Sequence, residues 1–509
     1  CKKIPKEFFT SPFFCVSGFR RRPAEKSAGK TQKHLTVGLF WCILVFVWLY
    51  ANIFFTEDRS GKENRSMHNE LLKVAKFGGS SLSDPRRFGE AISIIKAQEE
   101  RRFVVVSAPG KRFSGDEKVT DLLYACYDAA QNGNQEAFHR IFDRIKERFF
   151  LLQDALCPDF SLDEDFETIC AGLKRRMGKD YAASSAGKST VGVVLAKCLG
   201  YPFVDPADCV FFKDDGAFDS KHTNGALHSV LTSLGRAVIP GFYGSMPNDT
   251  IRTFSRGGSD ITGSIVDADM YENWTDVDGF LMADPRIVQN PRVMESVTYH
   301  ELRELSYMGA TVLHEDSVLP VRMAGIPILI KNTCNPSAPG TLILPRRDSE
   351  PALPITGIAG RKGFSALTVE KDMMNGELGF CRKILQVLEE NDVNFEHMPT
   401  GIDGVTVVAP TTQLAGKRMN ILSNICRKAK PECAYFEDHI ALIAVVGSGV
   451  YNHRFSGSSP ISTVFSALSD ANIPVLLTNR SLAENNIIVG VDENRFEDAI
   501  RAIYSSFVK

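Results

Sequence analysis

Short apolar runs alternate with amphipathic stretches along the chain from Leu71 onward. The apolar runs predict strands, and the stretches whose apolar residues recur three and four positions apart predict helices. The predicted elements, in chain order, are a strand at 72–77, a helix at 86–99, a strand at 103–107, a helix at 120–130, and strands at 237–240, 279–282 and 326–331. This alternation is typical of an α/β fold with a mostly parallel sheet sandwiched between helices.

A polar, proline-rich run at residues 345–354 interrupts the alternation and predicts a linker. We therefore expect a first domain at residues 67–345, a linker at 346–356 and a second region at 357–509. Ligands bind sheets of the α/β type at the carboxyl ends of the strands. Glycine-rich loops that follow strands in the first domain are accordingly the candidate functional sites.

The second region contains an internal repeat. Residues 388–395 (LEENDVNF) match residues 468–475 (LSDANIPV), and each copy is a helix end that runs into a strand. Apolar residues recur at helical spacing up to the first residue of each copy, at 380, 384, 385 and 388 and again at 464, 465 and 468. The pattern predicts two related α+β modules. Paired modules of this kind offer interface clefts for small effectors. The alternative interpretation is that they have only a structural role.

The first 66 residues need a separate interpretation. An uncharged, apolar run between His34 and Glu57 is long enough to cross a bilayer as a helix. The basic residues before it would keep the N-terminus inside and place everything afterwards outside. Because the chain begins at Cys1 and Met67 lies just before the first predicted strand, we expect residues 1–66 to be a non-native upstream segment. The expected protein is then cytoplasmic, and a real membrane anchor is the alternative.

Composition places the remainder among globular proteins. The chain of 509 residues is 44% hydrophobic and 24% charged, which suits several packed units. Its formal net charge of −2 gives no electrostatic basis for binding nucleic acid, because duplex binders concentrate Lys and Arg. No nucleic-acid partner is expected.

The cysteines and histidines do not predict a metal site. The 12 cysteines include no C-x-x-C pair, and no Cys or His cluster has the spacing of zinc ligands. Reduced thiols are therefore expected. His300-Glu301 begins a metalloprotease-like pattern, but Glu304 stands where the second His is required.

Two glycine-rich segments carry the first chemical signal. Residues 76–81 (KFGGSS) follow a predicted strand, so their backbone N–H groups can converge on an anion beside the Lys76 charge. A lone Gly-Gly turn is usually only a turn. Residues 254–262 (FSRGGSDIT) form a second such segment. Two segments of this kind suit a polyanion together with an acidic substrate.

A third segment, residues 274–286 (WTDVDGFLMADPR), places carboxylates and an arginine around a short apolar run, and a solvated hairpin is its bland interpretation. Together the three segments resemble the aspartokinase family of amino-acid kinases, whose signatures are K-F-G-G-S-S, G-R-G-G-S-D and W-x-D-V-D-G followed by A-D-P-R. The resemblance covers residue 71 to the C-terminus. It includes 104–108 (VVVSA), 118–122 (KVTDL), 328–333 (ILIKNT) and the tandem repeat, which resembles paired ACT modules.

The resemblance implies the amino-acid kinase fold and transfer of the ATP γ-phosphoryl group to the side-chain carboxylate of L-aspartate. The product is 4-phospho-L-aspartate, and the reaction is the first step of lysine, threonine and methionine biosynthesis. A carboxylate is already a nucleophile near neutral pH, so charge neutralisation and alignment are the main requirements. Mg²⁺ would bridge the phosphates rather than occupy a protein cage. The implied nucleotide-binding residues are Lys76, Phe77, Gly78, Gly79, Ser80, Thr275, Asp276 and Arg286.

The implied aspartate pocket contains Arg256, which would hold the α-carboxylate with two donors, together with Ser107 and Thr120. Lys76, Arg256 and Asp260 are the implied catalytic residues. Bland alternatives remain for two of the pocket residues and for Arg286. Thr120 would serve as a helix N-cap, Ser107 as a hydroxyl at a strand end, and Arg286 as a surface ion-pair partner.

The chain departs from the family at a substrate position. The family carries S-x-G-E, with its Glu near the substrate ammonium, whereas this chain reads Ser185-Ala186-Gly187-Lys188. A lysine there would repel the ammonium group, so either Lys188 points elsewhere or aspartate binding is weakened. The same stretch is not a P-loop, because Ala182 replaces the required first glycine.

The repeat region predicts regulation. Residues 397–403 resemble the effector-binding turn of lysine-sensitive relatives, which implies contacts from Met398, Gly401 and Asp403. In the second copy, residues 478–482 (TNRSL) depart from the family's S-Q-G-S-S turn. We expect feedback inhibition by lysine, alone or together with threonine, and a homodimer formed through this region. The alternatives are a catalytically impaired amino-acid sensor and a kinase for another carboxylate or carbamate.

Overall fold

The computed structural model describes residues 71–508 apart from 176–177, 187–190, 255–261, 264–267, 311–320, 348–352, 452–458 and 481–484. The expected upstream segment, with the apolar run between His34 and Glu57, lies outside the described residues. Among the helices of residues 71–508 that the structure describes, none is both long enough and apolar enough to span a bilayer.

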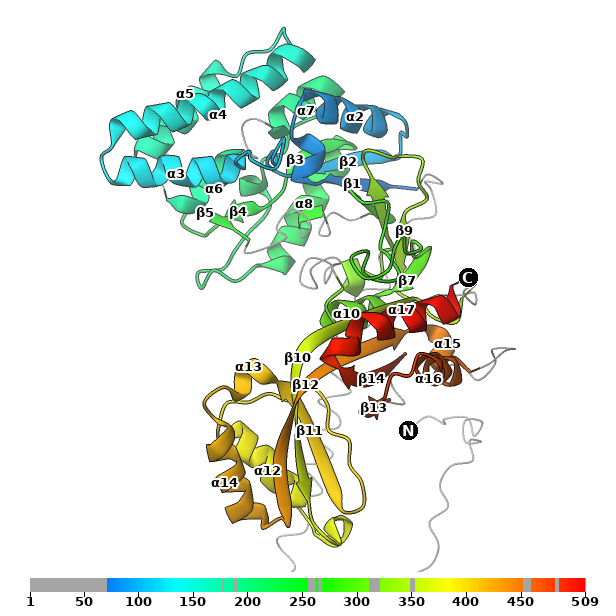
Figure 1. Ribbon diagram of the computed structural model, residues 1–509. Helices are drawn as coiled ribbons and strands as arrows, with labels where there is room; N and C mark the ends of the chain where they lie inside the picture. Colours follow the sequence, from blue (N-terminus) through cyan, green and yellow to red (C-terminus); the bar gives the residue numbers. More distant parts are fainter. Residues whose placement is uncertain are drawn as a thin grey trace, which may run out of the picture. The chain divides into compact units, whose positions relative to one another are not determined.

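A seven-stranded sheet forms the centre of the first domain (Figure 1). Its strands, in spatial order, are β3 (Ala237–Pro240), β2 (Arg101–Val106), β1 (Lys73–Phe77), β6 (Met270–Thr275), β8 (Ile328–Asn332), β9 (Thr341–Leu344) and β7 (Ser296–Thr298). The first five strands are mutually parallel, and β9 runs antiparallel to β8. The carboxyl ends of β3, β2, β1, β6 and β8 therefore lie at one edge of the sheet.

Both faces of the sheet are buried, because successive strand residues point to opposite sides. Ala75 and Phe77 of β1 belong to the core that packs against one set of helices, whereas Val74 belongs to the core on the other face. Among the residues that the structure describes, the helices of at least eight residues in this domain are α2 (Pro85–Lys96), α3 (Val119–Gln131), α4 (Gln135–Leu156), α5 (Asp163–Lys174), α6 (Lys179–Ala186), α7 (Gly192–Leu199), α8 (Ser220–Leu234) and α10 (Tyr299–Tyr307). The expected α/β sandwich is confirmed.

The second region is built on a five-stranded antiparallel sheet. Its strands, in spatial order, are β11 (Gly404–Pro410), β10 (Gly357–Glu370), β12 (Cys433–Val446), β14 (Asn486–Asp492) and β13 (Leu477–Asn479). The helices α12 (Phe380–Glu389) and α14 (Arg418–Ala429) pack together beside one half of the sheet, and α16 (Pro460–Asp470) and α17 (Phe496–Phe507) beside the other (Figure 1). The two expected α+β modules are thus present, but they share the long strands β10 and β12.

The internal repeat has a matching backbone in its two copies. Asp392 and Asn472 occupy equivalent positions, and both adopt a left-handed conformation, with φ of 49° and 52°. The following amide donates back into the helix in each copy, from Val393 to the Leu388 carbonyl at 3.0 Å and from Ile473 to the Leu468 carbonyl at 2.9 Å. Asn and Asp tolerate the left-handed region best among residues with a side chain, which explains their place in both copies.

Two expectations about local structure are wrong. The predicted strand at 279–282 is absent, since only an isolated bridge joins Leu281 to Val293, and the strand of this segment is β6 instead. The expectation of reduced thiols fails at one pair, because the structure joins Cys157 to Cys198 in a disulfide. These residues are 41 positions apart in sequence, but α4 and α7 pack together and bring them side by side.

Candidate active site

The loops that follow the parallel strands meet at the carboxyl edge of the seven-stranded sheet. Phe77 at the end of β1 lies opposite Val106 of β2 on one side and Trp274 of β6 on the other, and Thr275 lies opposite Asn332 of β8. Three of the sequence signatures, at 76–81, 104–108 and 274–286, therefore continue from neighbouring strands.

The glycine turn after β1 is held by its neighbours. The Gly78 amide donates to the Trp274 carbonyl at 3.1 Å, and the Ser81 amide donates to the Gly78 carbonyl at 3.0 Å. The buried hydroxyls of Ser81 and Thr333 lie 2.7 Å apart in a hydrogen bond, and the Thr333 amide donates to the Thr275 carbonyl at 2.9 Å. The loops after β1, β6 and β8 are therefore connected directly.

The loop after β2 crosses the same turn. The Gly110 amide donates to the Gly79 carbonyl at 2.8 Å, and the Ser107 amide donates to the Phe77 carbonyl at 3.2 Å. A Cβ atom on Gly79 would lie 2.7 Å from the Ala108 carbonyl oxygen, closer than van der Waals contact allows. The crossing of the two loops thus requires glycine at position 79.

Lys76 lies at this edge as a buried cation. The residue is only 7% exposed, and its Nζ donates to Asn273 Oδ1 at 3.3 Å. Asn273 is itself buried and lies beside Lys76 in the register of β1 and β6. The sequence assigned no role to Asn273. The signal available was an amide residue inside an otherwise buried strand, directly before the carboxylate-rich segment.

The carboxylates of the third segment separate into two groups. Asp278 Oδ1 accepts from the side-chain amides of Asn332 and Asn335, at 2.8 and 3.1 Å, and so fixes the loop after β8. Thr275 Oγ1 donates to Asp276 Oδ1 at 3.1 Å, and Asp276 is exposed. Asp276 and Asp278 are both exposed, and they differ in that Asp278 bonds to the loop after β8 whereas Asp276 bonds to its neighbour Thr275.

Arg286 forms a surface ion pair, which is the alternative role that the sequence left open for it. Its side chain is 82% exposed and bonds to Asp284, with Nη2–Oδ2 at 2.6 Å. These bonds hold the pKa of the Asp284 carboxyl below its ordinary value. The sequence signature at 328–333 contains Lys331 of β8 but predicts no role for it, and its Nζ lies 5.7 Å from the centroid of the Trp274 ring. Burial lowers the pKa of Lys331.

The residues expected in the aspartate pocket are only partly described. Ser107 follows β2, and Thr120 is the second residue of α3, both half-buried. Lys118 occupies the N-cap position of that helix, so the alternative role of Thr120 as the N-cap is wrong.

Arg256, Asp260 and Lys188 lie outside the described residues. The residues that flank 255–261 are described, and both bond to Phe242, the second residue after β3. The Phe254 amide donates to the Phe242 carbonyl at 2.9 Å, and the Phe242 amide donates to Thr262 Oγ1 at 3.2 Å. Phe242 has a φ of 96°, a strained conformation for a residue with a side chain. The second glycine segment therefore begins and ends at the edge that carries Lys76.

The expected effector residues lie on a hairpin of the second region. Met398 is half-buried and borders the core formed by α12, α14 and β11. Gly401 and Asp403 are exposed at the tip, where the Gly401 amide donates to the Gly404 carbonyl at 2.7 Å. Asp403 Oδ1 accepts from the Met373 amide at 2.8 Å. The structure thus places all three on one turn, with Met398 at its base.

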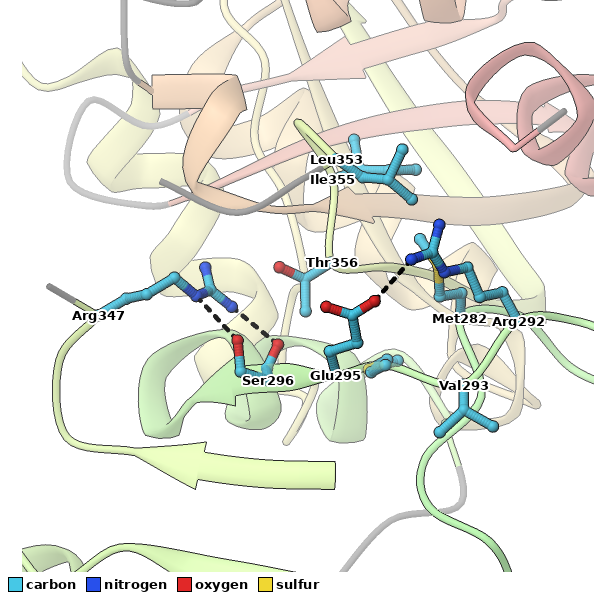
Figure 2. A pocket seen from close by; sticks show the side chains of 10 residues that line it. Met282, Arg292, Val293, Glu295, Ser296, Arg347, Leu353, Ile355 and Thr356 are labelled. Carbon is cyan, nitrogen blue, oxygen red and sulfur yellow. Dashed lines mark hydrogen bonds and ion pairs between the residues drawn. The ribbon is translucent and has the colours of Figure 1, made fainter. Parts of the chain in front are cut away.

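A pocket where the linker meets the first domain lies away from these residues. Residues 282 and 292–296 form one wall, and Arg347, Leu353, Ile355 and Thr356 form the other. Figure 2 shows its polar groups bonded to one another: Arg292 to Glu295 at 2.6 Å, and Arg347 to the Ser296 carbonyl oxygen and hydroxyl at 2.8 and 3.3 Å. The pocket lies between the linker and the first domain and is lined by none of the residues of the glycine turns.

Comparison with known proteins agrees with this architecture. The sequence model of the amino acid kinase family matches residues 72–332, and that of the ACT domain matches residues 443–507. Aspartokinase 3 of Bacillus subtilis (strain 168) is 35% identical over 455 residues, which cover 86% of this chain and 98% of that protein. The crystal structure of Clostridium acetobutylicum aspartate kinase is 44% identical with a TM-score of 0.75, covering 86% of this chain and 100% of that one.

A more distant structure, E. coli aspartokinase III in complex with lysine and aspartate, shares the fold at 21% identity and a TM-score of 0.61, covering 86% of this chain and all of that one. A mostly parallel sheet between helices, with glycine turns at its carboxyl edge and a matching family model, defines a member of the amino-acid kinase family. Within this family the chain belongs to the aspartokinases, kinases that transfer a phosphoryl group from ATP to aspartate.

Proposed function

We propose that the reaction takes place at the carboxyl edge of β1, β2, β3, β6 and β8, where ATP donates its γ-phosphoryl group to the side-chain carboxylate of L-aspartate. The observation that carries the proposal is the buried Lys76 beside the crossing of the Gly79 and Gly110 loops. Lys76 would neutralise charge on the transferring phosphoryl group in a site with little water, where its effect is large. The amides of the glycine turn would bind phosphate oxygens.

Aspartate needs alignment rather than a base, because its carboxylate is ionised at neutral pH. Ser107 and Thr120 would line its pocket, Arg256 would bind its α-carboxylate with two donors, and Asp260 would face its ammonium group. Phe77, Gly78, Ser80, Thr275 and Asp276 would form the nucleotide side. Arg286 belongs to that side only if it leaves its ion pair with Asp284.

Magnesium would enter this site bound to the phosphates of the nucleotide. Among the described residues there is no group of three or more His, Cys, Asp or Glu side chains placed to hold a metal ion. The exposed Asp276 carboxylate offers a single protein ligand, which suits an ion that keeps phosphate and water ligands. Bound there, Mg²⁺ would neutralise phosphate charge.

The second region would regulate the enzyme as a lysine-responsive ACT pair that begins after the 346–356 linker, with threonine as a second effector to test. Met398, Gly401 and Asp403 would contact the effector. Support comes from the hairpin that joins them and from the lysine complex of E. coli aspartokinase III. Ile402 of that hairpin is 68% exposed, and Met373, whose amide bonds to Asp403, is 77% exposed, so exposed apolar side chains at the hairpin support a homodimer formed through this region.

A hydroxamate assay tests the catalytic proposal. The enzyme is incubated with MgATP, L-aspartate and hydroxylamine, and trapped acyl phosphate is measured with and without lysine and threonine. Product that depends on aspartate, and that falls when lysine is added, is expected. Absence of product at saturating substrates would leave the amino-acid sensor as the function. Lys188→Glu is the informative variant, since an unchanged KM for aspartate would show that the charge at this position does not limit binding.

A further inference from the structure

Arg148 is a buried arginine that the proposed site does not use. It lies in α4, whose sequence alternates charged and apolar residues, and only 8% of the residue is exposed. Burial lowers the pKa of its guanidinium group. Removing a charge from water is costly. Replacing a buried charged side chain with an apolar one of similar size often leaves the stability of a protein unchanged or raises it. The position of Arg148 therefore calls for a reason other than stability.

The guanidinium group of Arg148 bonds to three separate pieces of backbone. Nη2 donates to the Gly110 carbonyl at 2.7 Å and to the Ser83 carbonyl at 3.4 Å, and Nη1 donates to the Glu117 carbonyl at 2.8 Å. An arginine carries five N–H donors in a rigid planar fork, so one side chain can hold carbonyls that lie in different directions.

Each of these carbonyls belongs to a segment of the proposed site. Ser83 directly follows the turn Gly79–Leu82, and Gly110 is the residue whose amide bonds to Gly79. Glu117 comes directly before Lys118, the N-cap of the helix that carries Thr120. Arg148 thus connects the nucleotide side of the site to the aspartate side.

A carboxylate completes the arrangement. Asp116 Oδ2 lies 3.6 Å from Arg148 Nη1. The same carboxylate accepts from the Arg112 amide at 3.0 Å and from its Nε and Nη2 at 2.9 and 3.0 Å. The loop between β2 and α3 is therefore held by these contacts at residues 110, 112, 116 and 117.

We propose that Arg148 is a positioning residue for phosphoryl transfer, which sets the distance between the nucleotide turn after β1 and the aspartate-binding loop after β2. This inference rests on the proposed function of those two loops. Phosphoryl transfer depends on alignment of donor and acceptor, and a misplacement of about 1 Å can lower the rate about 100-fold. A lysine at this position would keep the charge but could not hold all three carbonyls.

The test compares Arg148→Lys with Arg144→Lys, a matched variant one helical turn earlier. Arg144 has a side chain that is 51% exposed and pairs with the Glu117 carboxylate. For R148K we expect a kcat about 10- to 100-fold below that of the parent enzyme, with a thermal midpoint close to the parent's. R144K should stay within twofold of the parent. Parent activity in the same hydroxamate assay shows that the proposed reaction holds, so a failure of this inference is distinct from a failure of the function.

A folded R148K enzyme with kcat and both KM values within twofold of the parent would overturn the proposal. Hydrogen exchange of the parent enzyme provides a measurement that does not depend on a variant. The amides of Ser81, Gly110, Arg112 and Asp116, which donate hydrogen bonds within these two loops, should be protected without substrates, because Arg148 already orders both loops. Rapid exchange in the free enzyme, with protection only after MgADP and aspartate are added, would also overturn it, since the substrates would then order the loops.

Discussion

Arg347 forms a bidentate ion pair with Glu301, in which the Nη1–Oε1 and Nη2–Oε2 distances are both 3.1 Å. Glu301 is completely buried, and it also accepts from the Thr356 hydroxyl at 2.9 Å. Arg347 and Thr356 stand near the two ends of the predicted linker, so one carboxylate of α10 holds both ends. Arg347 Nη1 lies within 3.4 Å of the Ser448 hydroxyl as well, which extends the contact to the second region.

Breaking this pair should destabilise the protein strongly. Arg347→Met leaves the Glu301 carboxylate buried without its cation, and removal of one partner of a buried ion pair costs about 3 to 5 kcal/mol. Urea-induced unfolding measures the loss. Arg346→Met, at an exposed neighbouring position, is the control and should change the free energy of unfolding by less than about 0.5 kcal/mol. Equal unfolding midpoints for the two variants would contradict this account.

Lys76 is expected to act on the chemical step. Replacing it with Met removes a charge aimed at the transferring phosphoryl group, so kcat should fall by about 100- to 1,000-fold. The control is Lys73→Met at the opposite end of β1, where Lys73 bonds to Gln98 at 2.7 Å and pairs with Glu272 at 3.6 Å. Steady-state hydroxamate formation measures both variants. A K76M enzyme with parental kcat would exclude Lys76 from the reaction.

Gly79 offers a sharper steric test. Gly79→Ala places a methyl group 2.7 Å from the Ala108 carbonyl, so the two loops must separate and both KM values should rise about 10-fold or more. Gly89→Ala is the matched control, because its new Cβ meets nothing within 4 Å in the middle of α2. That change should stabilise the helix by about 0.5 to 1 kcal/mol and leave the kinetics unchanged. Similar kinetics for both variants would show that the loop crossing is dispensable.

These contacts show where sequence patterns succeed and fail. Strands β1, β2 and β3 were predicted because they are apolar and short. Strand β6 was missed because it buries Glu272 and Asn273, whose partners Arg101 and Lys76 are 171 and 197 positions away. A polar residue becomes compatible with a core only through such distant partners, and a local pattern cannot contain them.

The same limit applies to the site. The glycine turns were evident from their residue types, since glycine marks close backbone approach. The sequence did not indicate a role for Arg148, because a charged residue in an amphipathic helix usually faces solvent. Its role depends on three carbonyls that belong to two loops and a helix start, and only the fold brings them together.

Asp116 predicts a pH dependence with a definite sign. Hydrogen bonds from Arg112 hold the pKa of the Asp116 carboxyl below its ordinary value. A carboxyl group whose pKa is lower in the folded state stabilises the protein above its unfolded pKa, near 4, and loses that contribution as pH falls further. Arg112→Met should therefore cost about 1 kcal/mol at pH 7, and the difference should shrink between about pH 5 and pH 2. Urea unfolding across this range, with Arg144→Met as control, measures it, and a difference independent of pH would contradict the assignment.

Cysteine reactivity should follow burial. Burial raises the pKa values of the Cys126 and Cys209 thiols to about 12, so at pH 8 only about 1 in 10⁴ of these groups is the reactive thiolate. Cys334, Cys426 and Cys433 are exposed. Iodoacetamide at pH 8 followed by peptide mass spectrometry should therefore modify the three exposed residues and leave both buried ones unmodified until urea unfolds the protein.

Cys334 adds a functional readout to this experiment, because it directly follows Thr333, whose hydroxyl bonds to Ser81 of the nucleotide turn. A nucleotide bound at that turn would cover the loop after β8. MgADP should then slow modification of Cys334 while leaving Cys426 and Cys433, in the second region, unaffected. Equal slowing at all three would indicate a general change in the protein. Unchanged modification of Cys334 at saturating MgADP would place the nucleotide elsewhere.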